Sequence, residues 1–175
     1  MDLYRHIHPE LTREQQGNYV ALARHLVLAV SEPNYESAEF GINYTALDLT
    51  TGDELQPDQV AAHDGPLACG PVGHAIRAGI PVLPAEPWPA YQLRVLGAAF
   101  DSPLEDWLLS ALWLGTDGTA TGAALRLMYV LDYGVPEDFA GIRAGQVASD
   151  YAENGFLWDR LDIVPPPSPG ARPAR

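Results

Sequence analysis

The chain has 175 residues, of which 47% are hydrophobic, and it carries a formal net charge of −13. This length and composition are typical of one folded domain and exclude an intrinsically disordered chain. All ten basic residues are arginine, and the strong negative charge argues against binding to nucleic acid or to a membrane of anionic lipid.

Three features of the sequence indicate where the protein is located and whether it contains a disulfide. No apolar run approaches the ~20 residues that a membrane-spanning helix needs. The N-terminus lacks the basic start and apolar run of a signal peptide. A single cysteine, Cys69, excludes an internal disulfide. We therefore expect a cytoplasmic protein.

The first predicted helix begins after Thr12, where Thr12 and Gln15 have the spacing of a capping box. Apolar residues then recur every three or four positions up to Val30, and Pro33 ends the helix. Residues 31–66 are the least regular part of the chain. Phe40–Thr45 and Ala46–Leu49 favour strands and residues 51–53 a turn, so a short hairpin and an irregular loop both remain open.

In the middle of the chain, proline and glycine residues mark where helices begin and end. Pro71 suits the first turn of a helix over 70–78, with Gly79 as its stop. The prolines between Pro81 and Pro89 predict an extended linker, and the residues from Trp88 to Leu96 a short helix after it.

The second half is more clearly helical. Ser102 and Pro103 have the pattern of a cap and a first-turn proline, and they open a helix through Trp113. A further helix starts at residue 119 or 121 and ends before Gly134, and a last short one covers 145–153. We predict a mostly α-helical single domain over residues 1–164, with five or six helices and an α+β alternative that has one small hairpin. The Pro-rich tail, residues 165–175, is predicted to be disordered.

Cys69 and His74 are the first candidates for catalysis, because a thiol beside an imidazole is the minimum for a cysteine nucleophile. Five residues along a helix correspond to about 500°, so the two side chains would point roughly 140° apart. A position just before a helix lowers a thiol's pKa, which favours Cys69 as a nucleophile with a more distant partner such as His63 or His25. The alternative is a buried cysteine that packs as a small hydrophobic residue.

The sequence gives little support for a metal site, for catalysis by paired carboxylates or for a ligand pocket. His6 and His8 alternate on a predicted arm, which is too little for a metal site, and no metal or other cofactor is expected. The adjacent carboxylate pairs fall at predicted helix starts or turns, where capping and solvation explain them. The tryptophans, Trp88 and Trp107 among them, favour a packed cluster, with a ligand pocket between these two as the alternative.

Residues 69–75, 106–113 and 117–136 form three segments that together resemble a family of small uncharacterised proteins from bacteria and their phages. Residues 69–75 are similar to the family's Cys-Gly…Gly-His-Ala segment, and residues 106–113 to its Trp-Leu-Phe-Ser…Trp helix. Residues 117–136 resemble its Gly-Ala-Ala-x-Arg…Gly-Val-Pro ending. Leu109 and Gly118 depart from the pattern, and a second family cysteine is absent, which argues against a two-thiol metal or redox role. The resemblance implies one packed unit and supplies no activity.

The leading functional hypothesis is a non-enzymatic interaction or regulatory protein that acts through a protein partner or self-association. Acidity can serve solubility alone, or it can form a surface that meets a basic partner or mimics nucleic acid, as in an inhibitor of phage–host conflict. The surface hypothesis predicts that a set of carboxylates gathers on one face: Asp48, Asp53, Glu54, Asp58 and Asp64. The alternatives are a Cys69-dependent hydrolase or transferase and a binder of small molecules at a Trp88-lined pocket.

Overall fold

The computed structural model describes residues 5–29, 35–36, 46–113, 120–137 and 160–162. Within these ranges the chain forms six helices and five short strands, so the prediction of a mostly helical fold is confirmed. No helix in this part of the chain is long and apolar enough to cross a membrane. The hairpin residues 40–45, the helix predicted over 145–153 and the tail from 165 lie outside the described residues.

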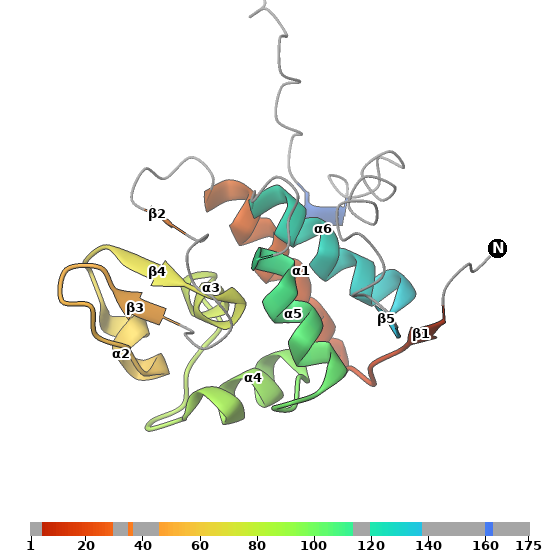
Figure 1. Ribbon diagram of the computed structural model, residues 1–175, viewed down its shortest axis with the longest axis horizontal. Helices are drawn as coiled ribbons and strands as arrows, with labels where there is room; N and C mark the ends of the chain where they lie inside the picture. Colours follow the sequence, from red (N-terminus) through yellow and green to blue (C-terminus); the bar gives the residue numbers. More distant parts are fainter. Residues whose placement is uncertain (1–4, 30–34, 37–45, 114–119, 138–159, 163–175) are drawn as a thin grey trace, which may run out of the picture.

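Helix α1 (Arg13–Ala29) is the centre of the helical body, which consists of α1, α3 (Pro71–Arg77), α4 (Trp88–Leu96), α5 (Pro103–Trp113) and α6 (Ala120–Tyr133). It contacts α6, α4 and α3, and α5 packs against α6 (Figure 1). The apolar stripe predicted for α1 is confirmed, because Tyr19, Leu22 and Leu26 are at most 1% exposed. At the edge of the body, β1 (His6–Ile7) pairs antiparallel with β5 (Val135–Pro136).

The predicted capping box begins α1. The backbone N–H of Gln15 donates to Thr12 Oγ1 at 3.1 Å, and the N–H of Thr12 donates to Gln15 Oε1 at 2.9 Å. Two donors at the helix start are thereby satisfied by side chains within the same turn.

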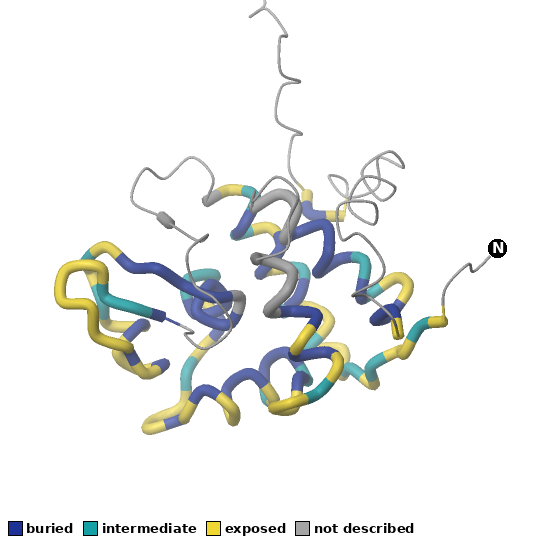
Figure 2. The backbone as a smooth tube through the Cα atoms, viewed as in Figure 1, coloured by how far each residue is buried: buried dark blue, intermediate teal, exposed yellow. Residues whose placement is uncertain are grey.

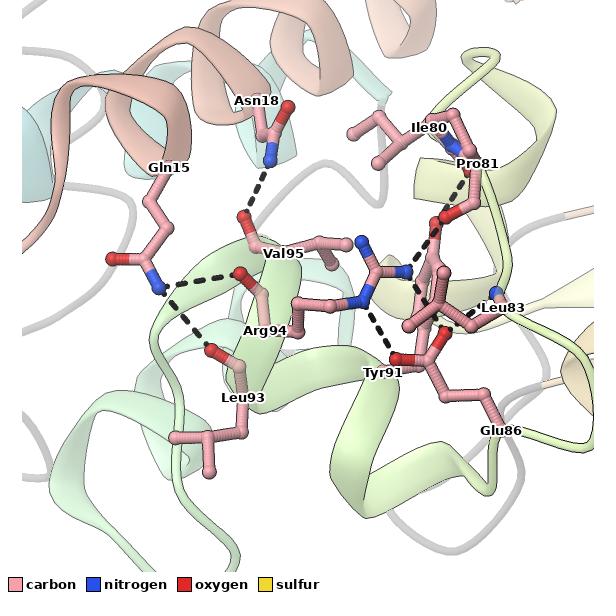
Figure 3. Close-up of polar contacts among 10 residues, drawn as sticks. All are labelled: Gln15, Asn18, Ile80, Pro81, Leu83, Glu86, Tyr91, Leu93, Arg94 and Val95. Atoms are coloured by element: carbon pink, nitrogen blue, oxygen red, sulfur yellow. Dashed lines mark hydrogen bonds and ion pairs between the residues drawn. The ribbon is translucent and has the colours of Figure 1, made fainter.

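Side chains of the same helix also bind the last carbonyls of α4. Gln15 Nε2 donates to the carbonyls of Leu93 and Arg94, and Asn18 Nδ2 donates to that of Val95 at 2.8 Å (Figure 3). Tyr19 Oη donates to the carbonyl of Leu96, also at 2.8 Å. Side chains of α1 therefore anchor the end of α4, which Gly97 terminates in the left-handed conformation.

The linker between α3 and α4 is held by one ion pair. Arg94 donates from Nε and Nη2 to the two carboxylate oxygens of Glu86, at 2.7 and 2.8 Å, and from Nη2 to the carbonyl of Pro81 (Figure 3). Glu86 also accepts the N–H of Leu83 at 2.9 Å. The arginine beside it lowers the pKa of Glu86, so the pair stays ionised at neutral pH.

The acidic lobe, residues 46–69, lies at one side of this body (Figure 1). It contains β3 (Ala46–Asp48), α2 (Pro57–Ala62) and β4 (Leu67–Cys69). Strand β3 pairs antiparallel with β4, and β2 (Tyr35–Glu36) pairs parallel with the other edge of β4. The predicted turn follows β3, where Leu47 and Glu54 form a bridge.

The lobe is joined to the helical body by apolar packing and by a buried hydrogen bond. Trp88 Nε1, at the start of α4, donates to the carbonyl of Leu55 at 3.0 Å. Buried lobe residues belong to the same core as the helices: Ala46, Leu55, Val60, Leu67 and Cys69. The lobe thus shares its hydrophobic core with the helical body and does not have a separate core of its own among the described residues.

Candidate functional site

The five carboxylates singled out in the sequence all lie in the acidic lobe. Asp53, Glu54, Asp58 and Asp64 are exposed, whereas Asp48 is half-buried. Figure 2 shows that the outer side of the lobe is largely exposed. Residues 25–76 contain no Arg or Lys, so no basic side chain of the lobe itself neutralises these charges. The lobe is therefore a concentrated source of negative potential.

Asp48 has a structural role in this lobe. Its Oδ1 accepts the backbone N–H groups of Thr50 at 2.7 Å and Thr51 at 3.3 Å, which shapes the turn after β3. The bond from Thr50 is the main reason why the pKa of Asp48 is lowered, and the nearby His63 lowers it further. The carboxylate therefore remains charged well into acidic solution.

His63 lies against this carboxylate, with Nε2 3.9 Å from Asp48 Oδ2. Its ring also covers Gly65, where an added Cβ would come within 2.8 Å of the imidazole Nε2. His63 thus packs against Asp48 and Gly65 within the lobe. The exposed acidic groups of the lobe are the other four carboxylates.

Cys69 ends β4 in the core, where its residue is 1% exposed. Burial raises the pKa of its thiol to about 12, and the nearby Arg77 only partly opposes this effect. At neutral pH the side chain is a thiol rather than a nucleophilic thiolate. The environment resembles that of a buried structural cysteine.

His74 lies in α3 and is 1% exposed. Its ring centroid is 6.0 Å from that of His25 on α1. Burial lowers the pKa of His74 to about 3, with smaller contributions from His25 and Arg77. The imidazole is therefore neutral under ordinary conditions and belongs to the packing between α1 and α3.

Trp88 and Trp107 lie in the core. Trp88 is 8% exposed and Trp107 is 1% exposed. Their indole nitrogens donate to the carbonyls of Leu55 and Arg126, at 3.0 and 3.2 Å. Both side chains have the environment of core residues that join elements.

The histidines of the N-terminal arm lie apart from the lobe. His6 is in β1, and its Nε2 is 2.7 Å from Tyr129 Oη of α6. Within the described ranges, no three or more His, Cys, Asp and Glu side chains come together as potential metal ligands.

Comparison of the chain with protein-family models, with curated proteins and with solved structures finds no match in any of the three. The site must therefore be interpreted from its own chemistry. Sequence reasoning named the five carboxylates but missed the arginine-free stretch around them. The spacing of the arginines was the signal that could have revealed it, because Arg24 and Arg77 follow one another in the chain with eight acidic residues between them.

Proposed function

We propose that the protein is a non-enzymatic interaction protein whose acidic lobe binds a basic surface on a protein partner. The observation that carries this proposal is the separation of charge along the chain. Residues 25–76 account for −8 of the net −13, which leaves −5 for the other 123 residues. A charge spread for solubility alone would not require this separation.

The geometry of the lobe supports a partner of opposite charge. Asp53, Glu54 and Asp64 are exposed between the elements of the lobe, and none of them takes part in an ion pair found among the described residues. Such a surface accelerates encounter with a basic partner and repels acidic ones. Two acidic lobes would also repel each other, which favours a different protein over self-association through this face.

The cysteine-dependent alternative receives less support. Its nucleophile would have to leave the core and lose a proton from a group whose pKa is raised to about 12. The lobe needs no rearrangement to present its charge.

The test compares two variants of equal charge. The lobe variant carries Asp53→Asn, Glu54→Gln and Asp64→Asn, and the control variant carries Glu10→Gln, Asp101→Asn and Glu137→Gln. All six positions are exposed, and each variant changes the net charge from −13 to −10. Asp48 and Asp58 are left intact, because they belong to a turn and to the first turn of α2.

Each form is used to capture partners from cells of the native host, and the affinity of the purified partner is then measured by calorimetry at several salt concentrations. We expect wild type and control to bind a basic protein with a salt-sensitive Kd, and the lobe variant to bind it at least about tenfold more weakly. Equal weakening in both variants would show that net charge, rather than the lobe, governs binding.

Nucleic-acid mimicry is a special case of this proposal and has a separate test. If the partner's surface normally binds DNA or RNA, an inhibitor of phage–host conflict would occupy that surface. A duplex DNA oligonucleotide should then compete with wild type for the captured partner. A partner whose binding is unchanged by saturating DNA and RNA would exclude mimicry while leaving the interaction proposal intact.

A further inference from the structure

His63 is the histidine of the acidic lobe. Between residues 46 and 69 the sequence has five acidic residues, one histidine and no arginine or lysine. The lobe therefore has a formal charge of −5 when this imidazole is neutral and −4 when it is protonated. Histidine is the side chain whose charge ordinarily changes between pH 5 and pH 8. The lobe thus contains a residue type that can change its charge near neutral pH.

The ring of His63 faces a carboxylate of the neighbouring strand. His63 follows the last residue of α2, and its Nε2 is 3.9 Å from Oδ2 of Asp48 in β3. This nitrogen is shielded from solvent and forms no hydrogen bond with the described residues. The side chain as a whole is 19% exposed, so solvent still reaches other atoms of the ring. A protonated imidazole at this place would have a carboxylate as its nearest ionic partner.

Asp48 connects His63 with the turn that leads to the exposed carboxylates. Its Oδ1 accepts the backbone N–H groups of Thr50 and Thr51, whereas its Oδ2 faces the imidazole. Its backbone N–H donates to the carbonyl of Asp53 at 2.9 Å, which closes the turn. A positive charge on the ring would therefore neutralise the carboxylate on which this turn is built.

The other charged groups of the surrounding elements are mostly acidic. Asp64 is the next residue and Asp58 is in the first turn of α2, and both are exposed. Strand β4, which pairs with β3, has no acidic or basic residue. Helix α3 contacts α2 and carries Arg77 and the buried, neutral His74. A proton on His63 therefore adds a positive charge to a region in which Arg77 is the permanent cation of the packed elements.

We propose that His63 regulates the acidic lobe by pH: when it is protonated it pairs with Asp48, and the lobe then binds a basic partner more weakly. This inference rests on the proposed function, because it concerns the affinity of the same surface. The direction follows from charge alone. Affinity for a basic partner falls as the pH is lowered through the range in which histidine takes up a proton.

The test uses a rhodamine-labelled peptide of nine arginines as a basic probe, whose charge stays constant because arginine remains protonated. Its affinity for the full chain is measured by fluorescence anisotropy at low salt, at pH 7.5 and pH 5.5. The lobe variant and its charge-matched control, defined above, identify the binding that depends on the lobe. At pH 7.5 we expect wild type and control to bind at least about tenfold more tightly than the lobe variant. Wild type should bind about threefold more weakly at pH 5.5 than at pH 7.5.

Two substitutions at His63 connect this change to the imidazole. His63→Gln cannot take up a proton, so it should keep the wild-type affinity at pH 7.5 and lose most of the decrease at pH 5.5. His63→Lys carries a permanent charge, so at pH 7.5 it should already bind as weakly as wild type does at pH 5.5. The matched control is His8→Gln, on the N-terminal arm, which should retain the wild-type pH dependence. Circular dichroism at both pH values verifies that each variant is folded.

The possible failures of the two proposals are distinguishable. Lobe-dependent binding that weakens equally at pH 5.5 in wild type, His63→Gln and His63→Lys would overturn regulation by His63 and leave the lobe as a binding surface. Equal affinity of wild type, lobe variant and charge-matched control at pH 7.5 would overturn both proposals.

Discussion

The helical body and the acidic lobe are stabilised by different means. In the body, large side chains such as Tyr19, Tyr91 and Trp107 are at most 1% exposed, and each donates a hydrogen bond to a backbone carbonyl. In the lobe, the buried residues are small or medium-sized, the strands are three residues long and the helix has six residues. Elements of this size are marginal without packing against a larger unit.

Charge follows the opposite trend. Glu86 in the body is buried and neutralised by Arg94, whereas the exposed lobe carboxylates lie in a stretch without arginine. Like charges close together oppose folding. The less stably packed region therefore carries the less favourable charge, which is an arrangement that folding alone does not explain. This difference agrees with the proposal above, in which the body supplies stability and the lobe is the binding surface.

The largest effect should come from the body. Trp107→Ala removes a side chain that is 1% exposed and lies between α5 and α6, together with its hydrogen bond to the carbonyl of Arg126. We expect a loss of about 3–5 kcal/mol in the free energy of unfolding, from the lost burial and the remaining cavity. Urea unfolding followed by circular dichroism measures it. A loss below about 1 kcal/mol would contradict the assignment of stability to the body.

An intermediate effect should come from His74, between α1 and α3. Burial lowers its folded pKa to about 3, whereas in the unfolded chain it titrates near 6.5. Between these two values the unfolded state binds the extra proton, so stability falls as the pH is lowered from 6.5. One such group removes roughly 2 kcal/mol between pH 6.5 and pH 5.

The pH dependence of unfolding in wild type and in His74→Gln isolates this contribution. We expect the variant to lose most of the slope between pH 6.5 and pH 5, even if it is less stable at every pH. His8→Gln, at an exposed position, is the control and should retain the wild-type slope. An unchanged slope in His74→Gln would show that this imidazole is accessible to protons in the folded state.

The helices could be predicted because their signals are local. Thr12 and Gln15 form the capping box that their spacing indicates, and the predicted start after Ser102 agrees with α5. Helix α2 was missed, although Gln56 and Gln59 form another capping box at its start. Strand β4 was missed because its pairing with β3 joins Ala46 to Cys69 across a segment that includes α2, and no local pattern encodes such a distant pairing.

The site was only partly predictable for the same reason. The carboxylates could be named from the sequence, but the β3–β4 pairing is what brings Asp48 and Asp64 into one lobe. For Cys69, the position before a helix predicts a lowered thiol pKa, yet the pKa is raised. Burial decides the direction, and burial depends on the tertiary packing of β4 rather than on its neighbours in sequence.

The smallest effect is the one that most directly separates the lobe from the body. If the lobe carboxylates repel one another, the variant with Asp53→Asn, Glu54→Gln and Asp64→Asn should unfold at a slightly higher urea concentration than wild type at low salt. The charge-matched control at Glu10, Asp101 and Glu137 should show no such gain, because its charges are spread over the body and Glu137 is paired with Arg5 at 3.7 Å. Screening reduces the repulsion as the Debye length falls from about 10 Å at 0.1 M salt to about 3 Å at 1 M. The gain should therefore disappear at 1 M NaCl.

Urea midpoints of the three proteins across this salt range measure the gain. Equal midpoints at low salt would mean that the lobe's charge imposes no detectable cost on folding. A gain confined to the lobe variant would instead show that the chain keeps these carboxylates at the expense of stability, as expected of groups retained for binding.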